Sequence, residues 1–423
     1  MSVHCAHDRN DLAGARRREP KVVVAHDYLT QRGGAERVAL ALLRVFPGAR
    51  IVTSIYEPSA TYAEFSEFEI QTSRLSKASA FRTDPRRALP LLANAWGRMT
   101  VDDADVVICS SSGWSHGITT TARKIVYCHN PARWLYQTQD YMRDNGTLAR
   151  TLLGAVAPSL RRWDRAKAAS AHLYLANSTA VAHRIARAYD RTAQVVHPPV
   201  ALSAGEPQPV PGIEPGFLLT VGRARGYKHT DVIAQAVKQI PDARLVAVGG
   251  LPNGAWPSRF IGLTDVSDTQ LRWLYANASA LVACAHEDFG LSPIEAYLAG
   301  TPALVLRAGG YIDTTLPGVT GEFVDELRPS AIADGIRRIR STSYSQGQIQ
   351  KHAQGFSFEA FAARMRAVVD QVIGAREHAR PADLPRDGAW RRPASSARSS
   401  TRLRGIGVEA GGGNEDLVDS APR

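Results

Sequence analysis

The sequence predicts an α/β protein with two doubly wound parallel-sheet (Rossmann-like) domains that face a central cleft. Two observations lead to this prediction: short β-branched runs alternate with helical patterns in two successive series, and a proline-rich segment separates the series. Strands that alternate with helices favour a parallel sheet covered on both faces. The chain has 423 residues, of which 44% are hydrophobic, so it is long enough to form two packed cores.

The first series begins with residues 21–27 (KVVVAHD), an apolar run suited to a buried strand. An Arg-Gly-Gly turn follows, and the spacing of apolar residues then predicts a helix over 35–45. This strand–turn–helix unit opens an N-terminal domain that we predict over residues 21–197. Further strands of this domain are predicted at 50–55, 105–109, 124–128 and 171–176.

The second series follows a linker predicted at 198–213, within a proline-rich stretch that holds six prolines between positions 198 and 215. The series defines a C-terminal domain over residues 214–356, and residues 357–376 then carry the pattern of one long helix. Strands of this domain are predicted at 216–221, 243–248, 259–263, 280–284 and 303–306.

The net charge of +11 favours an anionic partner, such as a membrane surface, a phosphorylated ligand or nucleic acid. The polar end regions, residues 1–20 and 377–423, are predicted to be disordered tails. No apolar run is long enough for a helical membrane span, and the first 20 residues lack the apolar core of a secretory signal. We therefore expect a cytoplasmic protein.

None of the four cysteines stands in a CxxC pair or at zinc-ligand spacing. Cys109, Cys128 and Cys284 lie in apolar runs, which is typical of small buried residues in a reducing compartment.

Two cations follow the first strand of the second domain. In open α/β sheets, ligands bind at the carboxyl ends of the strands, so two facing domains would hold a ligand in the cleft between them. Arg223 and Lys228 come after the strand at 216–221 and before a helix predicted over 230–239. Two cations beside a helix N-terminus suit a diphosphate, and two solvated charges on a loop are an equally weighted alternative.

The stretch 287–295 (EDFGLSPIE) supplies two candidate carboxylates. Glu287 stands just past the carboxyl end of a strand, where nothing local requires a carboxylate. Ser292 suits an N-cap with Pro293 at the first helical position, so Glu295 has two interpretations, as part of a capping box or as a ligand-binding group. Both interpretations stay open.

A glycine pair follows a strand in each domain. Gly33 and Gly34 precede the first helix, and Gly309 and Gly310 follow the strand at 303–306. Glycine pairs let backbone N–H groups approach an anion closely, and a simple turn is the alternative. Neither loop is a GxGxxG dinucleotide motif.

These motifs together resemble one enzyme family. GGAER at 33–37, VGR with a downstream lysine at 221–228, and the stretch at 287–295 are similar to the GT4-type retaining glycosyltransferases, which have the GT-B fold. YCHNPARWLY at 127–136 and the WDR…ANS stretch at 163–178 further resemble the mannosyltransferase-like branch. The resemblance extends over both predicted domains.

The resemblance implies a nucleotide-diphosphate sugar as donor substrate, with GDP-mannose favoured, and no metal ion or other cofactor. It implies a glycan or lipid-linked acceptor that attacks the face of the sugar from which the nucleotide leaves, so that the anomeric configuration is retained. The C-terminal helix would cross back to the first domain. The residues implied in catalysis are Glu287, His129, Arg223 and Lys228, and those implied in donor binding are Gly33, Gly34, Arg223, Lys228, Phe289, Gly290, Leu291 and Glu295.

The implied roles of these residues differ. Arg223 and Lys228 would hold the diphosphate and Glu295 the ribose, whereas Glu287 and His129 would lie near the donor sugar. A core histidine is the alternative for His129. The sequence departs from the family at position 288, an aspartate where many relatives have glycine, and at position 313, an aspartate where glutamate is usual. Both departures leave the donor sugar open.

Asp103 and Asp105 match the DxD metal motif of other glycosyltransferases. They precede a predicted strand, where aspartate is common, and the resembled family needs no metal for the reaction. We therefore do not assign them to a metal site. The paired carboxylates of a glycoside hydrolase are not evident either.

A basic and apolar stretch in the first domain favours docking on an anionic bilayer, close to a lipid-linked acceptor. A solvated basic face over an ordinary core is the alternative. Nucleic acid is not expected, because no recognition motif accompanies the charge. The stretch holds Arg74, Lys77, Arg82, Arg86, Arg87 and Arg98, interleaved with Leu75, Phe81, Leu89, Leu91, Leu92 and Trp96, and a second basic stretch lies at 161–167.

Several other functions are compatible with a two-domain fold of this kind. A sugar-nucleotide 2-epimerase would lack the two glutamates at 287 and 295, and a phosphorylase would need a pyridoxal-binding lysine that is not evident. A non-catalytic sugar-nucleotide-binding module would bind the donor without turnover. A glycosyltransferase that uses a UDP-sugar on a soluble acceptor is a further alternative.

Overall fold

The computed structural model describes residues 18–137, 147–200, 202, 205–222 and 228–378, without the side chains of 147–153 and 375–378. The chain divides into two compact units, Met1–His378 and Ala379–Arg423, and the second unit lies outside the described residues. The predicted tails therefore fall almost entirely outside them as well.

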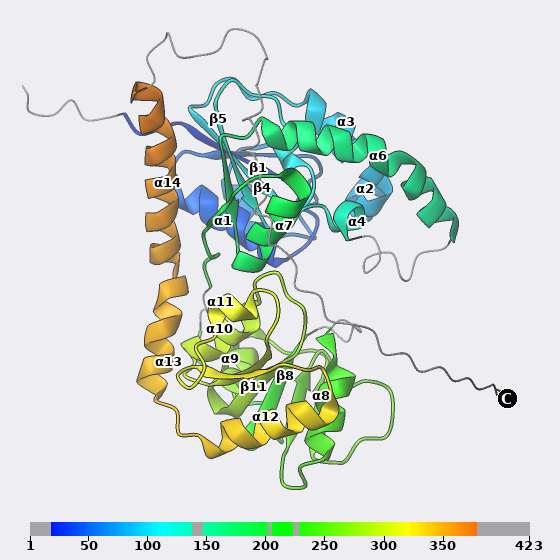
Figure 1. The fold of residues 1–423 in the computed structure, drawn as a ribbon, viewed down its shortest axis with the longest axis vertical. Coiled ribbons are helices and arrows are strands. Elements are labelled where there is room, and N and C mark those ends of the chain that lie inside the picture. The colour runs from blue at the N-terminus through cyan, green and yellow to red at the C-terminus, as the bar shows by residue number, and fades with distance from the viewer. Residues whose placement is uncertain (1–17, 138–146, 201, 203–204, 223–227, 379–423) are drawn as a thin grey trace, which may run out of the picture. The chain divides into compact units, whose positions relative to one another are not determined.

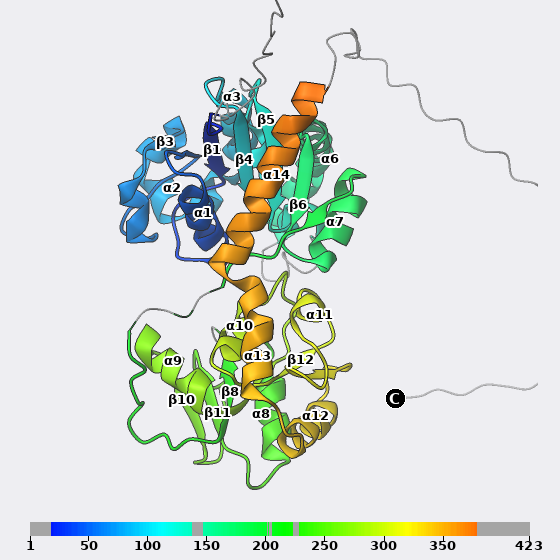
Figure 2. The same ribbon diagram turned by 90° about the vertical axis from the view of Figure 1, so that its left-hand side faces the viewer.

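The first parallel sheet has seven strands (Figures 1 and 2). They are β1 Val22–His26, β2 Arg50–Thr53, β3 Ile70–Thr72, β4 Val106–Ser111, β5 Arg123–Cys128, β6 Leu173–Ala176 and β7 Gln194–Val195. Their order in the sheet is β3-β2-β1-β4-β5-β6-β7, and every pair is parallel. Strand β1 is buried along its whole length because it is central and covered on both faces, as its β-branched sequence predicts.

The second parallel sheet has six strands. They are β8 Phe217–Val221, β9 Leu245–Val248, β10 Phe260–Leu263, β11 Ala278–Ala283, β12 Ala303–Leu306 and β13 Gly321–Val324. Their order is β10-β9-β8-β11-β12-β13, again with parallel pairs throughout. The two sheets confirm the predicted architecture of two Rossmann-like domains.

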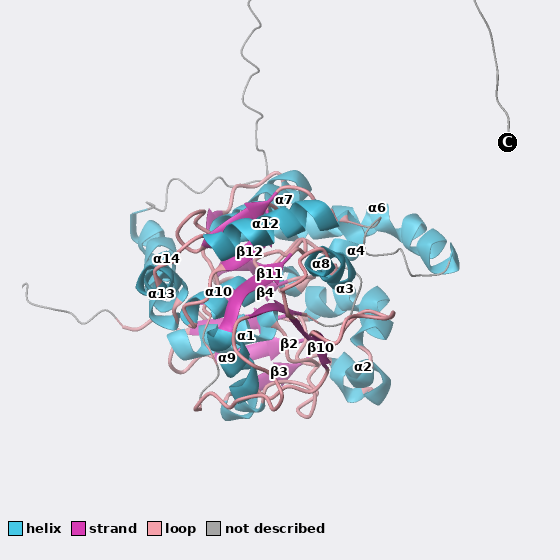
Figure 3. Ribbon diagram, turned by 90° about the horizontal axis from the view of Figure 1, so that it is seen from below, coloured by secondary structure: helices cyan, strands magenta, loops and turns pink. Residues whose placement is uncertain are grey.

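Helices lie on both sides of the strands, as Figure 3 shows. Those of the first domain are α1 Gly34–Val45, α2 Ser79–Thr83, α3 Leu89–Arg98, α4 Arg133–Tyr136, α6 Thr147–Ala169 and α7 Thr179–Tyr189. Those that follow are α8 Thr230–Lys238, α9 Asp268–Asn277, α10 Leu291–Leu298, α11 Tyr311–Thr314, α12 Pro329–Ser341, α13 Gln346–Ala353 and α14 Phe358–His378. Short 3-10 helices occur at Ala63–Glu67, Arg74–Lys77, Pro85–Ala88, Ser115–Gly117 and Gln354–Phe356.

Alternating side chains of the second sheet pack into two separate cores. Leu218 and Val282 face α8 and α12, whereas Leu219 and Val305 face α9, α10 and α13. Side chains of a strand alternate between its two faces, so each strand contributes to both layers.

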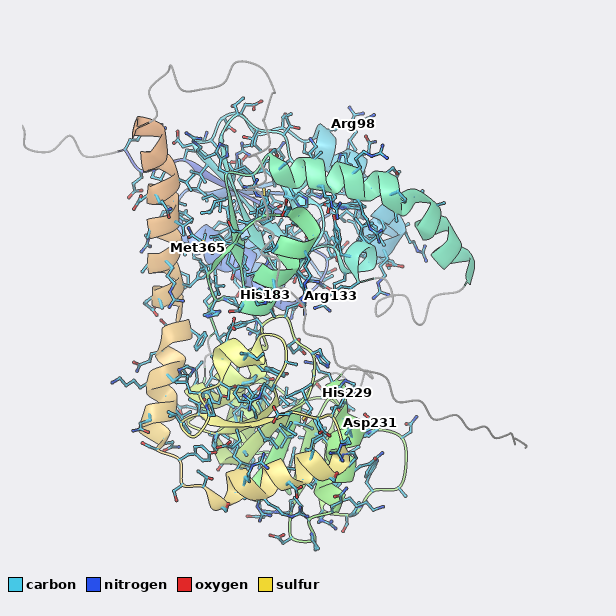
Figure 4. All side chains as sticks on the ribbon, viewed as in Figure 1. Arg98, Arg133, His183, His229, Asp231 and Met365 are labelled. Atoms are coloured by element: carbon cyan, nitrogen blue, oxygen red, sulfur yellow. The ribbon has the colours of Figure 1, made fainter. Side chains whose placement is uncertain are left out.

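The long C-terminal helix α14 packs on the first domain (Figures 1 and 2). Phe361, Met365 and Val368 lie in one core with Val38 and Leu42 of α1. The helix that the sequence predicts over residues 357–376 therefore packs through an apolar face, and Figure 4 labels Met365 of this helix. This packing agrees with the expectation that the chain returns to its first domain.

Three strands, β3, β7 and β13, are not predicted by the sequence pattern. Strands β3 and β7 have three and two residues and are partly or fully exposed, so they lack the apolar run that identifies the central strands. Strand β13 (GEFV) begins with a glycine whose φ is +159°, and a Cβ there would stand 1.8 Å from the carbonyl oxygen of Ala303. Glycine permits this close approach. Because glycine is uncommon in strands, it also lowers the strand propensity of the segment, and the strand is not predicted.

The three described cysteines are buried and free, as predicted. Burial raises the pKa of Cys109 and that of Cys284 to about 12, so both thiols stay protonated. None of the described helices is both long and apolar enough to cross a membrane.

The positions of the strand ends locate the cleft. Each sheet reverses its strand order between two neighbouring strands, β1 and β4 in the first and β8 and β11 in the second. Ligands of doubly wound sheets bind at such switch points, outside the carboxyl ends of the strands. Gly33 follows β1, Lys228 follows β8 and Glu287 follows β11, so the predicted residues gather at these edges.

Candidate functional site

A cavity of about 720 Å³ lies between the carboxyl edges of the two sheets. Loops and helix starts from both domains line it, because these segments follow strands at the switch points. Arg223 lies outside the described residues, so its prediction is not tested. The other predicted residues all line the cavity: Gly33, Gly34, His129, Lys228, Glu287, Phe289, Gly290, Leu291 and Glu295.

Lys228 and Glu287 form an ion pair on the cavity wall. The Lys228 ammonium donates to Glu287 Oε1, and the two side chains are 20% and 22% exposed. Gly222 makes room for the lysine, because a Cβ at this position would stand 2.9 Å from Lys228 Cγ. The pair is accessible from the cavity and only partly desolvated, so a bound anion can contact the ammonium.

Glu295 is not part of a capping box. Helix α10 begins at Leu291 after Gly290, which has a φ of +88° and caps without a side-chain hydrogen bond. Ser292 therefore lies inside the helix, and the predicted N-cap is wrong. The left-handed backbone of Gly290 starts the helix before the serine is reached.

Glu295 instead has partners that are distant in sequence. Its Oε2 accepts a hydrogen bond of 2.8 Å from the Tyr275 hydroxyl, and its Oε1 lies 3.7 Å from Arg37 Nη1. Burial raises the pKa of Glu295 above its usual value, although these two partners act in the opposite direction. A largely buried carboxylate, 16% exposed and held by two long-range partners on a cavity wall, suits ligand binding.

The two glycine pairs have different roles. Helix α1 begins at Gly34, and a Cβ on this residue would stand 3.4 Å from Leu291 Cδ1 of the other domain. This first pair lines the cavity and brings the starts of α1 and α10 close together.

The second glycine pair supports a neighbouring loop. Gly310 N–H donates to the Glu287 carbonyl over 3.0 Å, and a Cβ on Gly309 would stand 2.1 Å from the same oxygen. The Gly310 amide is thus occupied by the Glu287 carbonyl, which favours the simple-turn interpretation for this pair.

The two departures from the family pattern join the domains. Asp288 forms ion pairs with Arg133 and Arg184 of the first domain, and Figure 4 labels Arg133. Asp313 accepts a 2.5 Å hydrogen bond from the backbone N–H of Thr179, at the start of α7. Both aspartates thus connect the second domain to the first.

His129 is buried and neutral. Burial lowers its pKa to about 3, and the neighbouring His26 acts in the same direction. Its Nε2 lies 2.8 Å from Ser110 Oγ, at the end of β4. The ring is therefore a buried core group that also lines the cavity, and its role beside a donor sugar stays a prediction.

The sequence analysis did not single out several residues of this site. Glu36 and Arg37 stand inside the GGAER motif, and His26 ends strand β1, so motif position and strand end were available signals. Tyr275 had no such signal, because it reaches Glu295 only through packing of α9 against α10.

The DxD residues face away from this site. Asp103 pairs with Lys21 and Arg50, and Asp105 accepts from Arg18 and from the backbone of Lys21. They precede β4 and therefore stand at the opposite edge of the sheet from the cavity. Within the described part of the chain, no group of three or more His, Cys, Asp or Glu side chains could hold a metal ion.

A second cavity of about 680 Å³ lies in the first domain next to the first, and both are lined by Gly34, Ser112 and Asp288. Trp114 and Trp134 line the second cavity, with ring centroids 4.7 Å apart in an edge-to-face arrangement. Aromatic faces beside polar groups suit a hydroxyl-rich ligand. Two arginines, Arg86 and Arg133, and two aspartates, Asp27 and Asp84, also line it.

Comparison with known structures identifies the fold. Sucrose-phosphate synthase from Thermosynechococcus elongatus superposes with a TM-score of 0.62 at 17% identity, over 84% of this chain and 100% of that one. Anabaena HepE in complex with UDP superposes with a TM-score of 0.61 at 15% identity, over 83% of this chain and 100% of that one. The two domains thus have the GT-B arrangement of glycosyltransferases.

Residues 208–355, which lie in the second domain, match the family model described as "Glycosyl transferases group 1". D-inositol 3-phosphate glycosyltransferase from Mycobacterium marinum is 29% identical over 262 residues, which is 53% of this chain and 54% of that protein. The protein of the same name from Mycobacterium ulcerans is 28% identical over 252 residues, 51% of this chain and 52% of that protein. The chain thus spans about half the length of the curated relatives it matches.

Proposed function

We propose that this protein is a retaining glycosyltransferase that moves a hexose from a nucleotide-diphosphate sugar to an acceptor. One observation carries the proposal: a glycine loop, a lysine, two glutamates and the start of a helix, drawn from both domains, line a single cavity. The group 1 domain at residues 208–355 supports the same class.

The cavity suits a donor of this kind. Lys228 and the backbone amides of Phe289, Gly290 and Leu291 would hold the diphosphate, together with Arg223. Glu295 would accept from the ribose hydroxyls, and Glu287 and His129 would face the hexose. As the bond between sugar and phosphate breaks, charge builds on the leaving nucleotide, and fixed cations and amides stabilise that charge without reorganising.

The reaction exchanges one bond for another. The bond between the anomeric carbon and the phosphate oxygen breaks, a bond to the acceptor oxygen forms on the same face, and the acceptor proton passes to the departing phosphate. No metal ion or cofactor takes part in this proposal, since the lysine and the amides supply the positive charge.

The favoured donor is GDP-mannose, in line with the similarity of residues 127–136 and 163–178 to the mannosyltransferase-like branch. A UDP-sugar is the second candidate, and a specific observation favours it: the structure of Anabaena HepE, which superposes on this chain, contains UDP. A thermal-shift panel of nucleotide sugars separates the two.

In that panel, GDP-mannose is expected to raise the Tm of the wild type and to have little effect on Glu287→Ala. Glu326→Ala, an exposed acid paired with Arg328, is the matched control and should respond like the wild type. Stabilisation by UDP-sugars alone would overturn the donor choice, and stabilisation by none of them would overturn the class.

Turnover distinguishes the enzyme from a binding module. The second cavity would hold the acceptor, with Arg86 to contact a phosphate and the tryptophans to contact a ring. We propose a glycan or lipid-linked acceptor; D-inositol 3-phosphate, the substrate in the name of the curated relatives, is the soluble candidate. Release of GDP from GDP-mannose with either acceptor supports the enzyme, and donor binding without release in both cases supports the module.

We further propose a cytoplasmic protein that docks on the inner face of the membrane. Only part of the basic and apolar stretch predicted for this docking is exposed. Leu92 and Trp96 belong to the core, and Leu91 is 45% exposed. Arg161 and Arg165 of the second basic stretch donate to backbone carbonyls of the first domain. The docking surface is therefore confined to Leu91 and exposed cations, namely Arg74, Lys77, Arg86, Arg87 and Arg98.

Flotation with anionic phosphatidylglycerol vesicles at moderate salt tests this surface. We expect the wild type to float and the double variant Arg87→Glu/Arg98→Glu to remain in the dense fraction. The double variant Arg328→Glu/Arg337→Glu, an equal charge change at exposed arginines of the second domain, is the control and should float. Failure of the wild type to bind would refute the docking.

A further inference from the structure

Four buried polar side chains form a line that ends at the candidate site. Glu36 Oε1 lies 3.8 Å from His26 Nε2, and His26 Nδ1 lies 3.0 Å from Ser110 Oγ. The same Ser110 oxygen lies 2.8 Å from His129 Nε2. Glu36, His26 and Ser110 are at most 2% exposed, and only the last member, His129, reaches the cavity wall.

Ser110 fixes the direction of this line. A hydroxyl has one proton, so it donates to one histidine and accepts from the other. In the first arrangement His129 Nε2–H donates to Ser110, which donates to His26 Nδ1, and His26 Nε2–H points at Glu36. In the second, every donor and acceptor is exchanged, and the bare Nε2 of His26 faces the carboxylate.

An ionised Glu36 selects the first arrangement. Glu36 lies in the first turn of α1, where the helix dipole favours a negative charge, and its Oε1 accepts from Gln31 Nε2 over 2.9 Å. A carboxylate attracts the His26 N–H and repels a lone pair at the same position. Glu36 Oε2 is buried without a hydrogen-bond partner among the described residues, so the carboxylate has few groups that stabilise its charge, and a His26 proton near Oε1 would be one of them.

We infer that Glu36, His26 and Ser110 are positioning residues that hold His129 as the Nε2-protonated tautomer, leaving its Nδ1 as an acceptor for a hydroxyl of the bound sugar. The ring is neutral at physiological pH, because burial lowers the pKa of His129 to about 3. The tautomer follows from the contacts alone, whereas the sugar hydroxyl rests on the proposed function. The motif GGAER thus combines a glycine loop at the cavity with a buried carboxylate behind it.

The tautomer is directly measurable by NMR of the full chain with ¹⁵N-labelled histidine rings. The His129 signals are assigned by their loss in His129→Gln. In the ligand-free wild type we expect a protonated Nε2 and a bare Nδ1. A protonated Nδ1 in the wild type overturns the inference without any variant.

Glu36→Leu tests the origin of this preference. Without the carboxylate, a buried His26 Nε2–H has no acceptor, so His26 should donate to Ser110 through Nδ1, and His129 should change to the Nδ1-protonated form. Ser111→Ala is the matched control: Ser111 is the next residue of β4 and contacts a different histidine, His116. The tautomer of His129 should be unchanged in this control.

Ser110→Ala tests the connection itself and serves also if Glu36→Leu does not fold. With the hydroxyl removed, His129 should lose its strong preference for one tautomer, and adding Glu36→Leu should cause no further change. An unchanged His129 tautomer in Ser110→Ala, or in Glu36→Leu, overturns the relay.

Activity gives an independent measurement. We expect Glu36→Leu to lower kcat/KM for GDP-mannose about tenfold, the size of one mismatched hydrogen bond, with Ser111→Ala close to the wild type. If the tautomer changes as expected but no nucleotide sugar is turned over by the wild type, the relay stands and the proposed function fails. If kcat/KM falls while the tautomer does not change, the relay is overturned.

Discussion

The carboxyl edges of the two sheets differ in how they hold polar groups. At the edge of the first sheet, His26, Ser110 and Glu36 are almost completely buried and connect through one hydroxyl. At the edge of the second sheet, Lys228 and Glu287 are charged and about one-fifth exposed. Buried hydrogen bonds orient a group, and accessible charge binds an anion, so the first edge is suited to positioning and the second to electrostatic stabilisation.

Removal of charge at the second edge should have the largest effect. Lys228→Ala removes a cation from the predicted diphosphate site, and we expect kcat to fall by about 10²–10³-fold, the loss typical of one stabilising donor. Steady-state kinetics with GDP-mannose measure the fall. Lys238→Ala, which changes an exposed lysine at the end of the following helix α8, is the control and should retain full activity. Equal activity of the two variants would contradict the proposal that the Lys228 charge stabilises the diphosphate.

The glycine pairs of the two edges should respond differently to alanine. Gly309→Ala introduces a Cβ at a φ of +59° and 2.1 Å from the Glu287 carbonyl, and should lower the free energy of unfolding by roughly 3 kcal/mol. Gly34→Ala has a favourable helical position and only a 3.4 Å contact, so it should leave stability nearly unchanged. Urea denaturation measures both.

A third glycine separates backbone strain from the steric contact. Gly48 has a φ of +78° and an open space around its missing Cβ, so Gly48→Ala should cost about 1 kcal/mol from the backbone alone. If Gly309→Ala costs no more than Gly48→Ala, then close packing behind the Glu287 loop does not explain the second glycine pair.

Glu295 is the most buried charge of the second edge, and its stability should depend on pH. Burial raises the pKa of Glu295 in the folded state above its value in the unfolded chain. The free energy of unfolding therefore falls as the pH rises from the unfolded-state pKa to the folded-state pKa, and it falls no further above the folded-state pKa. Glu295→Gln cannot ionise and should therefore have the higher Tm at neutral pH, with the difference vanishing near pH 4.

The same variant should bind nucleotide more weakly. An amide is a poorer acceptor than a carboxylate, and we expect GDP affinity to fall about tenfold by calorimetry. An increase in Tm together with a loss of affinity would mark Glu295 as a residue kept for ligand binding at the expense of stability. Unchanged affinity would assign it to packing with Tyr275.

The smallest effect is expected where the two edges meet. Asp288→Asn weakens two ion pairs to the first domain, with Arg133 and Arg184, which are 45% and 26% exposed and therefore screened by solvent. We expect KM for the donor to rise about threefold with little change in kcat. Asp325→Asn, which affects the exposed pair with Arg307, should change neither value.

Much of the site could be predicted because its residues follow strands. The runs that became β1, β8 and β11 are short and mainly apolar, and their ends place Gly33, Lys228 and Glu287 without knowledge of the fold. The start of α10 could not be predicted in this way. Ser292 and Pro293 have the composition of a helix start, but the backbone of Gly290, set by its packing against Tyr311, begins the helix earlier.

The sequence by itself determined the two α/β series, the long helix that packs on the first domain and the charged residues at the strand ends. These features depend on the periodicity of apolar residues and on local strand length, which a linear pattern contains. Only the tertiary structure decided the partners of each polar group. Glu295 meets Tyr275, and Asp288 meets Arg133, 155 residues away. Ser110 connects His26 at the end of β1 with His129, which follows β5. Packing brings together segments that no local pattern relates.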